Sequence, residues 1–203
     1  MTETTARLVF AAIWLPFAAM RIRYHRGSGA KPKALTTPEE GRLFGWLRWT
    51  LALPWFLTLL LWLVWPAPLR FAGFALPDAL RWLGAALFAA GALLVFWTNR
   101  TLGSNFSSTL ILRDGHQLIQ HGPYRHVRHP MYTSFLVMLA GLLLLAANWI
   151  VGGAPILFIL LLMAMRTPRE ERMLLGRFGD EYRRYMERTG RYLPRLRRRR
   201  AAS

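Results

Sequence analysis

The chain has 203 residues, 54% of them hydrophobic, and carries 27 Lys and Arg against 10 Asp and Glu, a net charge of +17. High apolar content and high basic charge conflict in a water-soluble globule, but they agree when apolar residues span a membrane and charges flank the spans. The aromatic residues stand in apolar runs rather than among the basic residues, which argues against nucleic-acid binding, and the absence of cysteine excludes disulfides and thiolate chemistry.

Five apolar runs predict membrane-spanning helices. They occupy residues 8–20, 49–65, 82–97, 131–147 and 150–165. A helix needs about 20 residues to cross the hydrocarbon layer, so the shorter runs require flanking Trp, Tyr and Arg at the interfaces. The first run reaches that length only if residues 4–7 join its helix. Its positive charge follows it, so we expect a span rather than a cleavable signal peptide. The predicted fold class is an all-α integral membrane protein with about five transmembrane helices.

The basic residues predict the orientation. Of the 27, 24 lie in residues 21–48, 98–130 and 166–203, and five spans place these three segments on one side. The positive-inside rule makes that side cytoplasmic, so we expect the N-terminus outside and the C-terminus in the cytoplasm. The Arg-, Ala- and Leu-rich composition is typical of a GC-rich bacterium, so we expect the bacterial inner membrane.

The fourth and fifth runs are joined by little more than Asn148 and Trp149, without a charge between them. This connection predicts a tight helical hairpin as the last two spans. Such a hairpin returns the chain to its starting side, so the polar segments before and after it can meet there.

The first of these polar segments, residues 116–132, holds four of the five histidines. Imidazole and guanidinium groups are costly near a bilayer, so this cluster indicates a site. Pro130 can begin a helix, whose free N–H groups and dipole attract anions, and Arg128 and His129 precede it directly. The helix start is therefore suited to a carboxylate or phosphate.

The second polar segment follows the fifth run and contains Arg166, Glu170 and Glu171. The two acids can hold ribose hydroxyls or a cationic group. Glu170 with Arg166 can instead form an ordinary i,i+4 salt bridge at a helix start, which makes Glu171 the better functional candidate.

Together the two segments resemble the isoprenylcysteine carboxyl methyltransferase family, within a wider group that includes phospholipid N-methyltransferases. The first motif, G-x-Y-x-x-x-R-H-P-x-Y, runs from Gly122 to Tyr132, and the second, R-T-x-x-E-E-x-x-L-x-x-x-F-G-x-E-Y-x-x-Y, from Arg166 to Tyr185. His116 also stands where the family has a histidine. The resemblance covers roughly residues 95–194.

This resemblance implies S-adenosylmethionine as methyl donor, bound by a cytoplasmic, helical C-terminal region outside the soluble methyltransferase fold. The sequence agrees, because it has no strand followed by a G-x-G-x-x-G turn. With the apolar runs, the resemblance divides the chain into two parts. Residues 1–98 are expected to contain transmembrane helices 1–3, and residues 99–203 a methyltransferase region with helices 4–5 and a basic tail.

Motif position assigns roles to individual residues. Arg166 is the predicted catalytic cation that orients an acceptor carboxylate, and Glu171 either fixes Arg166 or faces the sulfonium. The predicted cofactor-binding residues are His116, Gly122, Tyr124, Arg128, His129, Pro130, Tyr132, Glu170, Tyr182 and Tyr185. No metal site is predicted. The expected partners are membrane lipids and an amphiphilic or lipidated substrate whose reactive head lies in the cytosol.

Several alternatives stay open at this point. Within the methyltransferases, the acceptor can instead be a phospholipid amine or a small thiol. From other classes, an NADPH-dependent membrane sterol-type reductase and a non-catalytic binding protein are compatible with the pattern. Binding of S-adenosylmethionine, of NADPH or of neither separates these classes.

Overall fold

A computed structural model of the chain describes residues 1–27, 42–103 and 117–195. These residues form helices and no β-strand, which confirms the predicted all-α class. The α-helices are α1 (Glu3–Gly27), α2 (Arg42–Val64), α3 (Asp78–Leu102), α4 (Pro130–Ala146) and α5 (Ala154–Arg188). Shorter turns are η1 (Ala67–Ala72), η3 (Gly122–Arg125) and the π-helical η4 (Trp149–Gly153).

The helices coincide with the predicted apolar runs. Three stretches, Glu3–Arg23, Asp78–Leu102 and Trp149–Arg188, are long and apolar enough to cross a membrane, while Ala52–Val64 and Pro130–Ala146 are shorter apolar helices. Helix α1 includes residues 4–7, as span length required. The apolar helices identify an integral membrane protein.

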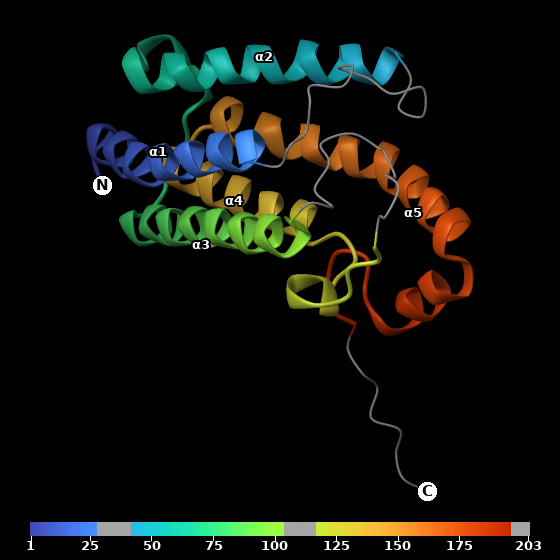
Figure 1. The fold of residues 1–203 in the computed structure, drawn as a ribbon. Coiled ribbons are helices and arrows are strands. Elements are labelled where there is room, and N and C mark those ends of the chain that lie inside the picture. Colours follow the sequence, from blue (N-terminus) through green and yellow to red (C-terminus); the bar gives the residue numbers. More distant parts are fainter. Residues whose placement is uncertain (28–41, 104–116, 196–203) are drawn as a thin grey trace, which may run out of the picture.

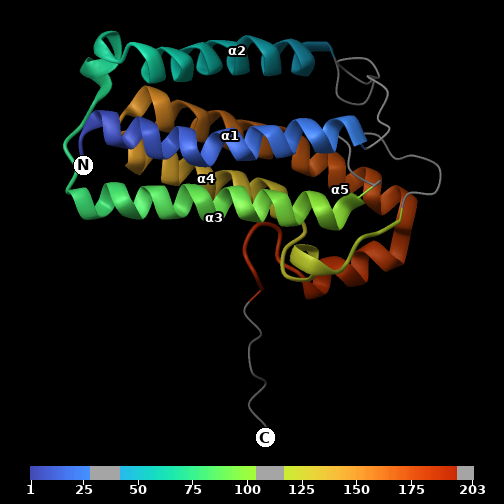
Figure 2. The same ribbon diagram turned by 60° about the vertical axis from the view of Figure 1, so that its left-hand side comes forward.

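The helices lie alongside one another and alternate in direction (Figures 1 and 2). As a result, residues 117–130 and the second half of α5 lie at one end of the bundle. The N-terminus, η1 and the turn from α4 to η4 lie at the other end (Figure 2). The bundle therefore brings both polar motifs to the same end.

An aromatic cluster joins the first three helices in the core. The ring of Phe10 on α1 lies 5.7 Å from that of Trp62 on α2 and 5.1 Å from that of Phe88 on α3, measured between centroids. All three side chains are buried. Aromatic contacts at such distances add to the stabilisation from buried area.

Glycines bring α3 and α4 into close contact. A Cβ atom added at Gly91 on α3 would lie 2.6 Å from Cα of Met138 on α4, and one added at Gly84 would lie 2.8 Å from the carbonyl oxygen of Gly141. Small residues allow this approach of backbones in membrane proteins. The pair holds the C-terminus of α3 beside the first motif, at the start of α4.

The predicted hairpin closes through a single asparagine. Ala147 takes a left-handed conformation, with φ of 47°. The side-chain oxygen of the buried Asn148 then accepts hydrogen bonds from the backbone N–H groups of Ile150 (3.0 Å) and Val151 (3.1 Å). Its amide nitrogen donates to the carbonyl oxygen of Leu69 (2.8 Å). The turn is thus satisfied internally, as an apolar environment demands.

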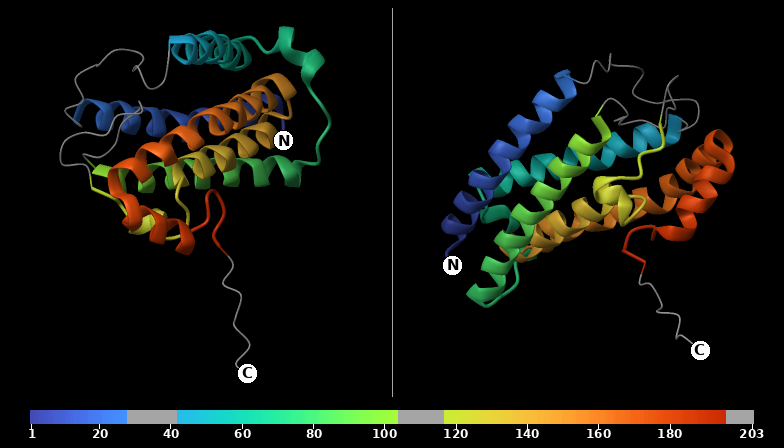
Figure 3. Two further views of the ribbon diagram at one scale, coloured as in Figure 1. Left: turned by 90° about the vertical axis from the view of Figure 1, so that its right-hand side faces the viewer. Right: turned by 60° about the horizontal axis from the view of Figure 1, so that its bottom comes forward.

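Helix α5 bends at Gly179, where φ of 50° and ψ of −122° interrupt the helix. Only glycine adopts this conformation readily. The following turn folds back beneath η3 (Figure 3). Residues 189–191 then run beside residues 127–129: the N–H of Arg128 donates to the carbonyl oxygen of Gly190 (2.8 Å), and the N–H of His129 to that of Arg191 (3.0 Å).

Candidate active site around Glu171

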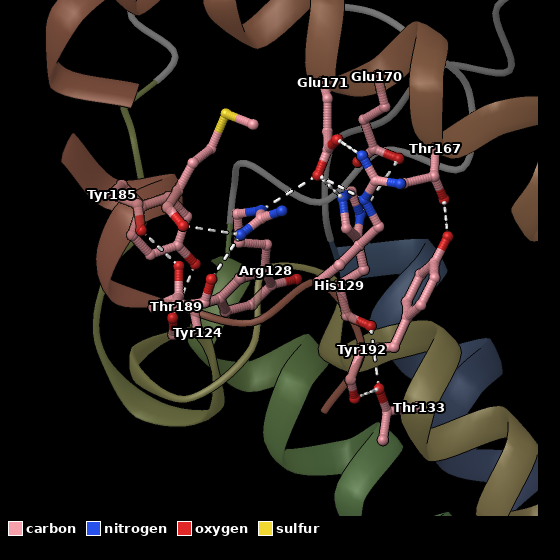
Figure 4. A network of polar contacts seen from close by, with 12 residues as sticks. Tyr124, Arg128, His129, Thr133, Thr167, Glu170, Glu171, Tyr185, Thr189 and Tyr192 are labelled. Atoms are coloured by element: carbon pink, nitrogen blue, oxygen red, sulfur yellow. Dashed lines mark hydrogen bonds and ion pairs between the residues drawn. The ribbon is translucent and has the colours of Figure 1, made fainter. Parts of the chain in front are cut away.

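Glu171 is a buried carboxylate at which the two motifs meet (Figure 4). Its side chain, on α5, is 5% exposed. It accepts hydrogen bonds from Nε of Arg128 (3.1 Å) and from both Nε (3.2 Å) and Nη2 of Arg191. Nε2 of His129 lies 3.4 Å from the same carboxylate. Two guanidinium groups and an imidazole therefore surround this acid, and the guanidinium charges compensate for its removal from water.

Arg128 links this carboxylate to the far end of α5. Its Nη1 donates to the carbonyl oxygens of Met186 (3.1 Å) and Thr189. The side chain is 9% exposed. A guanidinium has five N–H donors in a fixed fork, so it suits several acceptors that converge from different directions. Arg128 thereby fastens the segment after α5 to the first motif.

Arg191 is the second guanidinium group that contacts Glu171, and it lies on the solvent-exposed side of the carboxylate. Its side chain is 47% exposed, unlike that of Glu171. The hydrogen bond and the charge of Glu171 raise the pKa of the Arg191 guanidinium above its usual value. The ion pair thus stays charged over the whole working range of pH.

His129 is packed between two tyrosines. Its ring centroid lies 6.0 Å from that of Tyr132 and 5.9 Å from that of Tyr192. Tyr192 is itself anchored at both ends: its hydroxyl donates to Oγ1 of Thr167 (2.8 Å), and its carbonyl oxygen accepts from the hydroxyl of Thr133 (2.7 Å). These contacts fix the orientation of the imidazole (Figure 4).

Glu170 differs from its neighbour in exposure. Its side chain is 37% exposed, and Oε2 lies 3.8 Å from Nδ1 of His129. The double-acid motif therefore presents one carboxylate to protein cations and one to its surroundings. Glu170 has the accessible oxygens that a ligand needs.

Three tyrosines lie next to this centre. The hydroxyl of Tyr185 donates to the carbonyl oxygen of Tyr124 (2.7 Å). Burial raises the pKa of Tyr124, and the negative charge of Glu170 raises it further, so the Tyr124 phenol remains a neutral donor. The ring of Tyr182 lies 5.9 Å from that of Tyr185, and its buried hydroxyl has no hydrogen-bond partner among the described residues.

Gly122 and Pro130 of the first motif shape the course of its backbone. Gly122 has φ of 58°, and a Cβ there would lie 2.7 Å from Oγ1 of Thr101 at the end of α3. Pro130 begins α4, as predicted.

Arg166 lies on α5, half-buried, five residues before Glu171. His116 lies outside the described residues. The ligand roles of all these residues stay predictions.

Three residues of the network were absent from the sequence prediction, namely Thr189, Arg191 and Tyr192. They follow α5 and reach the site only because residues 189–191 pair with residues 127–129. The sequence feature that could have pointed to these residues is Gly190, which marks the end of a helical pattern just before Arg191 and Tyr192. It indicates a turn, but no spacing rule indicates the partner across that turn.

The described residues contain no group of three or more His, Cys, Asp or Glu side chains arranged to hold a metal ion. The centre is instead a network of cations, carboxylates and tyrosine hydroxyls. Such a network can orient a polar ligand and can stabilise charge.

Part of the chain is similar to known proteins. Residues 82–176 match the model of the isoprenylcysteine carboxyl methyltransferase (ICMT) family. A probable protein-S-isoprenylcysteine O-methyltransferase from Oryza sativa subsp. indica is 34% identical over 96 residues, which are 46% of this chain and 50% of the relative. Protein-S-isoprenylcysteine O-methyltransferase from Homo sapiens is 33% identical over 96 residues, which are 46% of this chain and 34% of the relative.

A solved structure extends the likeness in fold. It is titled as the eukaryotic intramembrane Ras methyltransferase ICMT, and it matches 92% of this chain and 67% of its own with a TM-score of 0.55 at 18% identity. The aligned part spans only half of the rice relative's length. The resemblance predicted from the two motifs is therefore confirmed for residues 82–176, which match the model of the isoprenylcysteine carboxyl methyltransferase family.

Proposed function

We propose that this chain is an integral membrane methyltransferase that uses S-adenosylmethionine to methylate a carboxylate in the polar head of a lipid-like substrate. The observation that carries this proposal is the Glu171 network, which joins the two motifs of the family-like region through Arg128 and His129. The names of the relatives favour a carboxyl acceptor over an amine or a thiol.

The proposed setting is a membrane crossed five times. In this arrangement the two shorter apolar helices, α2 and α4, also cross the membrane, in addition to the three long ones. The bundle end that carries both motifs then faces the cytoplasm, with the N-terminus outside, in a bacterial inner membrane. Residues 1–98 then contain the first three spans, and residues 99–203 contain the last two spans and the reaction site.

When bound, S-adenosylmethionine supplies an electrophilic methyl group on a sulfonium. The residues present fit such a ligand. Glu170 has accessible oxygens for ribose hydroxyls, and Tyr182 has a buried hydroxyl without a partner among the described residues. The rings of Tyr182 and Tyr185 provide flat apolar surface of the kind on which an adenine stacks. We propose that His116, Gly122, Pro130 and Tyr132 bind the same ligand.

The acceptor needs little chemical activation. A carboxylate is already ionised at neutral pH, so no general base is required. It needs a cation that orients it, and Arg166 is our candidate because it follows the apolar part of α5 directly. Holding two reactants in line can supply several kcal/mol of the barrier reduction.

Glu171 and Arg128 act in this proposal as positioning residues. Both oxygens of Glu171 accept from guanidinium groups of the protein, and Arg128 is committed to Glu171, Met186 and Thr189. The motif positions predict instead that Arg128 contacts the cofactor and that Glu171 either fixes Arg166 or faces the sulfonium. The geometry favours a role in which they hold His129 and Glu170 in place.

Methyl transfer from radiolabelled S-adenosylmethionine tests the proposal. Purified protein in lipid nanodiscs is given a prenylated cysteine with a free carboxylate, and the matched control acceptor has an amide in its place. We expect label in the lipid phase with the carboxylate only, and its release as methanol on alkaline hydrolysis, because esters hydrolyse while N-methyl and S-methyl groups persist.

The result also separates the alternatives. Alkali-stable label on added phospholipid or thiol would overturn the carboxyl assignment but keep the methyltransferase. Calorimetry that finds NADPH binding, or no binding of S-adenosylmethionine by well-folded protein, would overturn both.

A further inference from the structure

A polar cavity of about 540 Å³ lies next to the Glu171 centre. It is formed by the segment around η3, the end of α5 and the residues after it. Its lining is rich in nitrogen donors and contains no carboxylate among the described residues. The lining residues are Gln120, Arg125, His126, Tyr185, Arg188, Thr189, Pro194 and Arg195.

The cations of this cavity keep donors available for a ligand. Arg188 donates from Nη2 to Oε1 of Gln120 (2.7 Å), and Arg195 donates to the carbonyl oxygen of Glu187. Each guanidinium has five N–H donors, so one hydrogen bond leaves most of them free for other acceptors. The side chains of Arg125 and His126 are exposed.

None of the described acids lines the cavity. Glu181 accepts from Nε2 of Gln120 (2.9 Å), outside the lining. Three guanidinium groups and an imidazole therefore face one space of a size usual for small-ligand sites. S-adenosylmethionine carries a net positive charge, so this lining disfavours it.

We propose that this cavity binds a phosphate group, supplied by the headgroup of an anionic phospholipid. The planar fork of arginine matches phosphate oxygens, and several such forks around one space are typical of phosphate sites. The cavity lies at the bundle end that also carries the second half of α5, where many of the described basic residues lie, so headgroups are within reach in the proposed orientation. The inference does not depend on methyl transfer.

The cavity shares a wall with the Glu171 centre. Tyr185 and Thr189 line it, and the same residues hold the carbonyl of Tyr124 and the guanidinium of Arg128. A bound phosphate would therefore order the segments that position the active site. Binding should accordingly raise the melting temperature of the protein.

Calorimetry on detergent-solubilised protein with short-chain phosphatidylglycerol tests this, with short-chain phosphatidylcholine and inorganic phosphate as further probes at one ionic strength. The variant Arg125→Glu removes a lining cation. The control Arg177→Glu makes the same charge change at an exposed position on α5 that does not line the cavity. A melting curve of each protein shows whether it is folded.

We expect phosphatidylglycerol to bind the wild type and Arg177→Glu alike, and Arg125→Glu to bind about tenfold or more weakly. Competition by inorganic phosphate, with weaker affinity than the lipid, supports the headgroup. Equal binding of inorganic phosphate and lipid would overturn the lipid as source and leave a free phosphate. Equal losses in both variants, or no binding by the wild type, would overturn the site. If Arg125→Glu does not fold, Arg125→Gln gives the same comparison.

Discussion

Burial divides the cations around Glu171 into two kinds. Arg128 is 9% exposed and Arg191 is 47% exposed, although both donate to the same carboxylate. Removing one partner of a buried ion pair leaves an uncompensated charge in the protein interior, which costs much free energy. Removing a partner that is exposed at the surface costs little. The acid and the buried arginine are therefore the residues on which the site's integrity depends.

This difference predicts unequal effects of two charge-removing substitutions. Glu171→Gln strands Arg128 and should lower the free energy of unfolding by about 3 kcal/mol. Arg191→Gln should lower it by about 1 kcal/mol or less. Chemical denaturation in a single detergent, with S-adenosylmethionine affinity measured beside it, checks the order. Equal losses in the two variants would contradict the assignment of Arg128 as the buried partner.

The sequence predicts the members of this site better than their contacts. Motif spacing selected Arg128, His129 and Glu171, because these residue types are costly near a bilayer without a reason to be there. It did not predict that Arg128 and Glu171 bind each other. Arg191 was missed for a related reason: its partner lies across a chain reversal, and no helical period connects the two positions.

Among the elements, α3 and α4 form the tightest backbone contact described above. Gly91 allows it, because a Cβ there would meet Cα of Met138 at 2.6 Å. Gly176 on α5 is the opposite case, with nothing within 4 Å of an added Cβ. The same substitution at these two glycines thus reports packing at one site and helix propensity at the other.

We expect Gly91→Ala to lower the free energy of unfolding by about 1–3 kcal/mol, since the two backbones must separate. Gly176→Ala should raise it by up to about 1 kcal/mol, because alanine is the better helix former. Melting temperatures of both variants in the same detergent give the comparison. A stabilised Gly91→Ala protein would mean that α3 and α4 pack less closely than the contact distances indicate.

The elements themselves were well predicted, for a physical reason. Apolar runs and the uncharged Asn148–Trp149 connection left few alternatives to helices and a hairpin, and Pro130 marked the start of α4. The bend at Gly179 was not predicted. A glycine within a helical pattern is compatible with a continuous helix, so the sequence pattern alone does not indicate the bend.

For the whole molecule, alternating helix directions place the connection after η1 at one end and the second half of α5 at the other (Figure 2). The protein has no cysteine, so a single introduced thiol is a clean reporter of either end. Ala75 and Arg177 are exposed positions at opposite ends.

In the proposed orientation, a membrane-impermeant maleimide should label Ala75→Cys in spheroplasts and Arg177→Cys only in inside-out vesicles. The reason is that the positive-inside rule retains the basic end of the bundle in the cytoplasm. The cysteine-free parent should stay unlabelled in both preparations. Labelling of both variants from one side would contradict an odd number of crossings between these positions.

The pairing of residues 127–129 with residues 189–191 has a consequence for synthesis of the protein. Translation proceeds at about 5–20 residues per second, and the helices enter the membrane as they are made. Arg128 emerges some sixty residues before Thr189 and Gly190, whose carbonyl oxygens receive its donors. For several seconds the nascent chain therefore lacks the carbonyl oxygens that Arg128 contacts, and a ribosome that stalls in that interval leaves the Glu171 network incomplete.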